Sequence, residues 1–392
     1  MKIAKKGITI IVSLGIFFLL FAGLQRLVYP KYASGVLEGN FTAEYYEETT
    51  NHDVVLIGDC EVYENIDPIY LWSNYGITSY IRGNAQQLPW QSYYMLEDTL
   101  RTEVPKVVIY NVRALTCAEP QREEYNRMTL DGMRWSGTKR KAVQVSMCEG
   151  EAFMDYVFPL LRYHSRITKL TKEDLTYFWK PRKITHNGYY MRIDVLPASE
   201  SDVADTAWLL GDSDEEGEEE IEDPWAEIEG AEEEADAEFA PATSEVKEGT
   251  PFGSRPMEYL DKMRSLCEEK GIRFILMKAP SLAPQWYPSD NQQILDYAEK
   301  YHLPYINFYD LLEETGIDYE TDTYDGGLHM NLSGADKLSK YLGKVLASEY
   351  GLEDHRGEPV YDKVYNEKIH FYEEIKRQQQ KELEQYGEVR NY

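Results

Sequence analysis

The sequence predicts an α/β protein in which a central parallel sheet lies between two layers of helices. Short runs of β-branched and aliphatic residues alternate with segments of helical periodicity, first from residue 53 and again after residue 256. Because strand, helix, strand, helix and strand follow one another within about sixty residues, the strands should pair in parallel through right-handed crossovers. A chain of 392 residues is long enough for one such three-layer α/β/α domain with insertions.

In the first half of the chain, three buried apolar runs predict strands over residues 53–57, 78–82 and 106–111. Helices are predicted between them over residues 65–75 and 86–101, and Asp67-Pro68 supplies the start signal of the first. Residues 35–51 form a polar connector before the first strand. From residue 115 to about 195, Met, Arg, Tyr and Trp predominate, which predicts a mostly helical insertion that roofs a site.

The alternation resumes at Pro256. It predicts helices over residues 257–270, 290–301 and 332–350, and strands over residues 273–277 and 305–308. Asn331 or Ser333 is available to cap the last of these helices. The highly charged residues 363–386 predict a further helix that lies exposed.

Negative charge is concentrated in one segment. The formal net charge is −28, but residues 200–249 hold 21 acidic residues and one basic residue, Lys247, so this stretch carries −20 and the rest of the chain −8. The segment has almost no branched apolar residues, so we expect an acidic disordered linker over residues 196–252. A calcium site is disfavoured because no DxDxDG loop occurs. An acidic protein of this kind is not expected to bind nucleic acid.

The N-terminus predicts a membrane anchor. Three lysines occur in the first six residues, and no charged residue occurs from Gly7 to Leu24. As a helix these eighteen residues rise about 27 Å, close to the roughly 30 Å hydrocarbon core of a bilayer. We expect residues 1–32 to be an uncleaved signal anchor in the cell membrane, with a single pass and the remaining chain extracytoplasmic; a cleaved signal peptide is the alternative.

These observations divide the chain into five parts. The anchor, residues 1–32, precedes the first part of the α/β domain, residues 33–195, which contains the helical insertion from about residue 115. The acidic linker, residues 196–252, separates it from the second part, residues 253–352. A charged helical tail follows over residues 353–392.

In an open parallel sheet, chemistry takes place past the carboxyl ends of the strands. Cys60 follows the first predicted strand, and His329 lies far away in a glycine-rich loop before the last core helix, with Asp325 in the same loop. A thiol, an imidazole and a carboxylate can act as nucleophile, base and orienting acid. Lys278 follows the fourth strand and is a candidate for substrate contact, with a solvated loop as the alternative. None of the four cysteines forms a CxxC motif, and we expect neither a metal nor a cofactor.

The motifs together resemble the SGNH/GDSL hydrolase superfamily. The resemblance rests on the Gly58-Asp59-Cys60 turn after the first strand, Gly and Asn in later turns, and the acid-plus-histidine loop of residues 325–331, and it covers residues 53–195 and 253–348. The anchor and the helical middle around residues 158–164 are similar to the membrane-anchored, extracytoplasmic branch. Proteins of that branch assist D-alanylation or O-acetylation of cell-envelope polymers.

The resemblance implies a role for each matching position. It places Cys60 where the family has its nucleophilic serine, His329 as general base and Asp325 as the orienting acid. The oxyanion hole would comprise the backbone N–H groups of Cys60 and Gly83 and the side chain of one asparagine, either Asn84 or Asn111. The chain departs from the family in having cysteine for serine and an acid four, not three, residues before the histidine. The glycines between that acid and the histidine permit the longer spacing.

The resulting expectation is an acyl-ester hydrolase or O-acyltransferase that acts on a cell-envelope polysaccharide or another acyl ester. A membrane-bound acyl donor protein is a candidate partner. The alternative is a catalytically inactive scaffold or glycan-binding protein that keeps the fold, for which 32 tyrosines offer sugar-stacking surfaces. A thiol-redox protein is disfavoured because Cys60 has no nearby partner cysteine.

Overall fold

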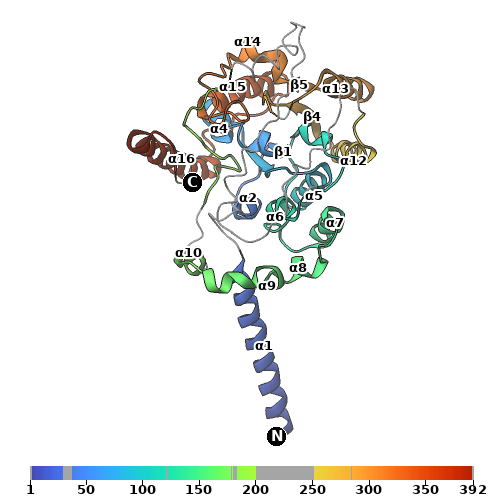
Figure 1. The fold of residues 1–392 in the computed structure, drawn as a ribbon, viewed down its shortest axis with the longest axis vertical. Coiled ribbons are helices and arrows are strands. Elements are labelled where there is room, and N and C mark those ends of the chain that lie inside the picture. The colour runs from blue at the N-terminus through green and yellow to red at the C-terminus, as the bar shows by residue number, and fades with distance from the viewer. Residues whose placement is uncertain are drawn as a thin grey trace.

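The computed structural model describes residues 2–29, 38–120, 122–177, 179, 183–199, 251–283 and 285–390. They form a five-stranded, all-parallel sheet with helices on both faces, and a long N-terminal helix extends from the body (Figure 1). The strand order is β2-β1-β3-β4-β5. The strands are β1 (Val54–Gly58), β2 (Ser79–Gly83), β3 (Val107–Asn111), β4 (Arg273–Lys278) and β5 (Tyr305–Asn307). The predicted α/β class and parallel pairing are therefore confirmed.

The helices fall into three groups. Those that cover the sheet are α3 (Cys60–Tyr63), α4 (Pro68–Tyr75), α5 (Pro89–Thr99), α12 (Ser254–Lys270), α13 (Pro288–Tyr301), α14 (Leu312–Thr315), α15 (Leu332–Ser348) and α16 (Pro359–Tyr386), with the 3₁₀ turns η2 (Arg113–Thr116) and η6 (Phe308–Leu311). Those at the N-terminus are α1 (Lys2–Val28), α2 (Glu38–Glu44) and η1 (Tyr45–Glu47). The insertion contains α6 (Glu123–Leu130), α7 (Gly137–Ser146), α8 (Phe153–Val157), α9 (Pro159–Tyr163), η3 (His164–Lys169) and α10 (Lys172–Thr176).

Alternate residues of each strand face opposite layers of helices. Val54 and Leu56 of β1 pack with α4 and α15, whereas Val55 and Ile57 pack with α5, α12 and α13. Burial on both faces explains why these strands are continuous apolar runs. The three-layer arrangement follows directly from that pattern.

Helix caps agree with the predicted signals. The Asp67 carboxylate accepts hydrogen bonds from the backbone N–H groups of Ile69 and Tyr70, and Pro68 opens α4, three residues later than the periodicity predicts. Of the two candidate caps for α15, Asn331 holds the position and accepts from the N–H groups of Ser333 and Gly334.

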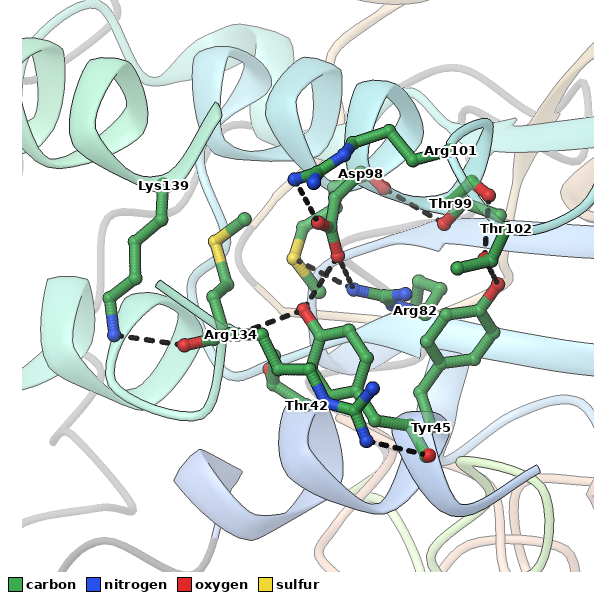
Figure 2. A network of polar contacts seen from close by, with 12 residues as sticks. Thr42, Tyr45, Arg82, Asp98, Thr99, Arg101, Thr102, Arg134 and Lys139 are labelled. Carbon is green, nitrogen blue, oxygen red and sulfur yellow. Dashed lines mark hydrogen bonds and ion pairs between the residues drawn. The ribbon is translucent and has the colours of Figure 1, made fainter. Parts of the chain in front are cut away.

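The predicted connector is instead a packed element. Residues 38–47 form α2 and η1, and Tyr45 is buried. Figure 2 shows why: the Arg82 guanidinium from β2 lies 3.8 Å from the centre of the Tyr45 ring, and its Nη2 is 3.3 Å from Oδ2 of Asp98 on α5. The Tyr45 hydroxyl is 3.0 Å from that of Thr102. A buried cation thus fixes the N-terminal helices to the sheet, which apolar periodicity does not reveal.

The insertion departs from the predicted roof. Its helices α6, α7 and α8 pack against α5 and α12 in a separate cluster around Trp90 and Leu130. The part that passes the loop of His329 is its extended end, where the carbonyl of Arg192 accepts from the N–H of Leu332 and the carbonyl of Asp194 accepts from the amide of Asn331.

The acidic linker predicted to be disordered lies outside the described residues from 200 to 250. Its described ends belong to the body: Leu196 donates to the carbonyl of Thr323, and Phe252 is buried against α13. The boundaries predicted at residues 196 and 252 are therefore a few residues too wide.

The C-terminal helix is charged but is not simply exposed. Tyr365 is fully buried, and its ring stacks on Trp72 of α4 with centroids 4.0 Å apart. Two helical turns after Tyr365, the Tyr372 hydroxyl donates a hydrogen bond to Asp67 at 2.6 Å. Two tyrosines seven residues apart therefore dock one stripe of α16 onto the body.

Replacing Gly58 by alanine should destabilise the turn after β1. An added Cβ would lie 2.5 Å from Cγ2 of Val62 and 2.9 Å from Cβ of Asn111, so we expect a loss of about 1–3 kcal/mol in the free energy of unfolding. Denaturant unfolding followed by circular dichroism in detergent measures it. Gly137→Ala is the control, because nothing lies within 4 Å of the added Cβ. Equal stability of the two variants would contradict the tight turn.

Candidate active site

Cys60 lies at the carboxyl end of a central strand. β1 ends at Gly58, Asp59 caps the next helix by accepting from the N–H of Glu61, and Cys60 is the first residue of α3. In the sheet, β1 lies between β2 and β3. The chain passes from β1 to β2 on one side and then crosses back to β3 on the other side, so the strand order reverses at β1. Such a switch point is where open α/β sheets form their sites. The thiol is 9% exposed.

His329 is held by the acid predicted from the sequence. Nδ1 of His329 lies 2.7 Å from Oδ2 of Asp325, and the backbone N–H of His329 donates to Oδ1 at 2.8 Å. The two glycines between them have φ values of +77° and +96°, so the loop folds back in a conformation that other residues rarely adopt. The four-residue spacing is thereby accommodated.

The Cys60 thiol and the His329 imidazole lie close enough for each to affect the pKa of the other. Burial raises the pKa of the Cys60 thiol, whereas the charge of His329 and a side-chain hydrogen bond to it act in the opposite direction. Because Nδ1 of His329 is engaged by Asp325, any proton exchange with the thiol would run through Nε2. The structure therefore brings together Cys60, His329 and Asp325 in the order sulfur, imidazole, carboxylate.

A second carboxylate, which the sequence reasoning missed, also contacts the imidazole. Oε2 of Glu64 lies 3.6 Å from Nδ1 of His329 and accepts a hydrogen bond from the Tyr324 hydroxyl. The Tyr324 ring in turn stacks on His329 with centroids 6.2 Å apart. Glu64 follows Cys60 by four residues, and its N–H donates to the carbonyl of Cys60. That i, i+4 spacing on a helical turn is the signal that could have identified it.

The carboxylates determine the charge of the histidine. Burial alone would lower the pKa of His329, but Glu64, Cys60 and Asp325 outweigh burial and raise it well above its usual value. Burial raises the pKa of Glu64 to about 7, despite the opposing effect of His329. Glu64 therefore titrates near neutral pH beside a histidine whose charged form is favoured.

Three of these side chains could also ligate a metal ion. One ligand atom from each of Glu64, Asp325 and His329 lies within 4.8 Å of the others. However, Nδ1 of His329 is already hydrogen-bonded to Asp325, and Glu64 already accepts from Tyr324. The observed contacts are those of an acid–base cluster.

Beneath Cys60 lies a group of buried charged and polar side chains, which we call the charge cluster. It comprises Asp59, Glu61, Asn111, Arg113 and Lys278. Nζ of Lys278 is 2.8 Å and 3.0 Å from the two carboxylate oxygens of Glu61, and the Asn111 amide donates to both Glu61 and Asp59. Arg113 pairs with Asp59 at 3.3 Å. Two positive and two negative side chains thus balance one another.

The charge cluster argues against the predicted substrate contact of Lys278. The side chain is fully buried, and its three donors go to the two Glu61 oxygens and to the carbonyl of Ala279. Burial lowers the pKa of Lys278, although Glu61 favours the charged form. Of the two cations in the charge cluster, Arg113 is the more accessible to solvent, because its side chain is 15% exposed.

The two asparagines predicted for the oxyanion hole are engaged elsewhere. Asn84 donates through its amide to Thr42 and Gln87, and Asn111 belongs to the charge cluster. Both are fully buried. Gly83 lies beside the turn after β1, because a Cβ on it would be 3.2 Å from the carbonyl oxygens of Gly58 and Asp59.

The site is nearly closed to solvent. His329 is fully buried and Glu64 is 1% exposed. Leu282 donates to the carbonyl of Gly327, while the Asn65 side chain accepts from the N–H of Met330, so the loop of His329 is held from two sides. A substrate must therefore approach through the small exposed surface of Cys60 or displace these segments.

Comparison with models of known protein families and with curated proteins found no match to this chain.

Lys278→Met should strongly destabilise the protein. It leaves the buried Glu61 carboxylate without its cation, which costs about 3–5 kcal/mol in the free energy of unfolding. Adding Glu61→Gln should recover part of that loss, because the uncompensated charge disappears. Lys106→Met is the matched control: its ion pair with Asp53 is solvent-exposed, and its loss should cost at most about 1 kcal/mol. Denaturant titration distinguishes these outcomes, and a Lys278→Met variant as stable as Lys106→Met would contradict the argument.

Proposed function

We propose that this protein is an acyl-ester hydrolase or O-acyltransferase of SGNH type, with Cys60 as nucleophile, His329 as general base and Asp325 as the acid that orients the base. One observation carries the proposal: Nδ1 of His329 lies 2.7 Å from Asp325, and the same imidazole lies close enough to the Cys60 thiol to lower its pKa against the effect of burial. This is the relation that nucleophilic catalysis requires, because the base must reach the nucleophile while a third group fixes the ring.

The proposed reaction has two steps. His329 takes the proton of the Cys60 thiol as sulfur attacks the ester carbonyl; the carbon–sulfur bond forms, the ester carbon–oxygen bond breaks, and the departing alkoxide receives the proton from the imidazolium. Water or a sugar hydroxyl then attacks the thioester, with His329 again as base, and the thiol is released. Hydrolysis and acyl transfer differ only in this acceptor.

The oxyanion that forms in both steps needs hydrogen-bond donors. The backbone N–H of Cys60 at the start of α3 is suited to this role, and Gly83 lies against the same turn. We propose Arg113, in place of Asn84 or Asn111, as the side chain that supports the negative charge of the oxyanion. Burial opposes the charge of Arg113, but Asp59 and, more weakly, Cys60 outweigh this effect and raise its pKa.

The N-terminal helix supports an envelope location. One helix, Lys6–Val28, is long and apolar enough to cross a membrane, and it lies near the N-terminus. We propose that it anchors the domain outside the cytoplasmic membrane, where a cell-envelope glycan is the acyl acceptor or ester substrate and a membrane-bound protein is the acyl donor.

A second candidate function is a catalytically inactive scaffold or glycan-binding protein of SGNH type. The closed site favours it, because Cys60 is only 9% exposed and burial raises the pKa of its thiol. A buried, protonated thiol is a poor nucleophile unless its partner base removes the proton.

Cys60→Ala should abolish acetyl-ester hydrolysis by the full-length protein in detergent. Removing the nucleophile should reduce the rate by at least about 10³-fold, since only binding and the oxyanion hole remain. Cys148→Ala, which replaces another free cysteine outside the site, should retain full activity. No hydrolysis by the wild type, or hydrolysis unchanged in Cys60→Ala, would remove the enzyme proposal. Saturable glycan binding that survives Cys60→Ser and His329→Ala would then favour the scaffold.

Glu64→Gln should move the pH profile of hydrolysis toward lower pH. His329 can accept a proton only when neutral, so activity rises with pH through its pKa, and Glu64 is the foremost charge that raises this pKa. Removing that charge should shift the rising limb down by about one pH unit. Asp336→Asn is the matched control, because burial also raises the pKa of Asp336 to about 7 but its charged neighbours are Asp67 and Lys376. An unmoved limb in Glu64→Gln, or an equal shift in both variants, would contradict the role of Glu64.

A further inference from the structure

Residues 153–177 and Trp179 lie at the end of α1 where it meets the body, and we call them the collar. They include α8, α9, η3 and α10, which lie in a row across the upper end of α1 (Figure 1). We propose that the collar is a second membrane-contacting surface, which rests on the lipid interface of the bilayer that α1 crosses. This inference depends on the proposed anchor but not on the proposed catalysis.

The collar is fixed to α1 by several contacts. The Gln25 side chain accepts from the N–H of Leu160 at 2.6 Å, and the Arg166 guanidinium donates to the carbonyl of Val28 at 2.8 Å. The rings of Phe21 and Phe158 lie 6.0 Å apart. The height of the collar along α1 is therefore defined.

At this position along α1, the collar lies at the level of the bilayer surface. The unbroken exposed apolar run of α1 extends from Gly7 to Leu20, which spans only about 20 Å of helix axis, whereas a hydrocarbon core is roughly 30 Å thick. The remaining thickness must extend past Phe21, where the collar begins to cover α1. Sliding α1 outward does not avoid this, because it draws Lys5 and Lys6 into hydrocarbon at a cost of up to about 3 kcal/mol each.

The surface of the collar suits this depth. Each of its short elements exposes a large apolar side chain: Met154 is 50% exposed, Leu161 53%, Ile167 47%, Leu175 52% and Trp179 83%. Exposed apolar residues on the described surface outside α1 gather here more than elsewhere, and tryptophan favours the interface.

The charge of the collar also favours contact with a lipid surface. Residues 153–179 contain four basic and three acidic residues, and Lys180, Arg182 and Lys183 follow them directly in the sequence, in a protein whose formal net charge is −28. A basic, apolar row of short helices beside a membrane span fits anionic lipid headgroups above and acyl chains below. A protein partner would not require this match to the height of α1.

Spin labels on the full-length protein test the proposal, with one copy in each nanodisc of mixed neutral and anionic lipid. Labels are placed at Leu161→Cys and Trp179→Cys in the collar, at Leu14→Cys in α1 and at Leu295→Cys on α13. Leu295 is 43% exposed, and the helix that carries it, α13, lies at the end of the molecule remote from α1 (Figure 1). The parent protein, with its four native cysteines, gives the background of labelling.

We expect both collar labels to lose collisions with a water-soluble nickel complex and to gain collisions with oxygen, as the Leu14 label does, while the Leu295 label stays accessible to nickel. Collar labels that behave like the Leu295 label, beside an immersed Leu14 label, would overturn the inference and leave a protein as the occupant of the collar. A Leu14 label exposed to nickel would overturn both the anchor and the inference. Ester hydrolysis, measured separately, fails or succeeds independently of these labels.

Discussion

The balance of charge beneath Cys60 is the constraint on which this structure depends. Asp59 and Glu61 follow β1, Asn111 and Arg113 lie at the end of β3, and Lys278 ends β4. Moving four charged groups out of water is costly, and mutual pairing offsets that cost only when every partner is in place. The charge cluster therefore joins the carboxyl ends of three strands into one rigid unit. Cys60 lies between two members of that unit, so its position is set by electrostatics as much as by packing.

The loop of His329 reaches Cys60 through a second, independent set of contacts. Asn65, five residues after Cys60, accepts from the N–H of Met330 and donates to Ser281, which connects α3 to both late segments of the chain. Two positive φ values then allow Asp325 to fold back onto the imidazole. A thiol and a base more than 260 residues apart in sequence are thus aligned by hydrogen bonds to short, buried side chains, which leave little freedom for either group.

Much of this could be predicted from local sequence, because the strands are apolar runs and caps such as Asp67 and Asn331 act on neighbouring residues. Asp325 and His329 share one loop, so their pairing was also visible. Lys278 was misjudged because its partner, Glu61, lies 217 residues away, and no pattern in sequence reveals a buried ion pair between two strand ends. Asn84 was misjudged for the same reason, since its partner Thr42 belongs to a helix that the polar N-terminal sequence did not predict.

The number of protons at the site decides how the thiol can act. Glu64 and Asp325 bring two carboxylates to a single imidazole, so one more negative charge than positive charge is present when His329 is protonated and both acids are ionised. A Cys60 thiolate would add another, and burial already disfavours it. With a pKa raised to about 7, Glu64 is the group able to take up a proton and relieve this excess as the thiolate forms. The closed site therefore need not be an inert one: its second carboxylate can set the free energy needed to ionise the thiol.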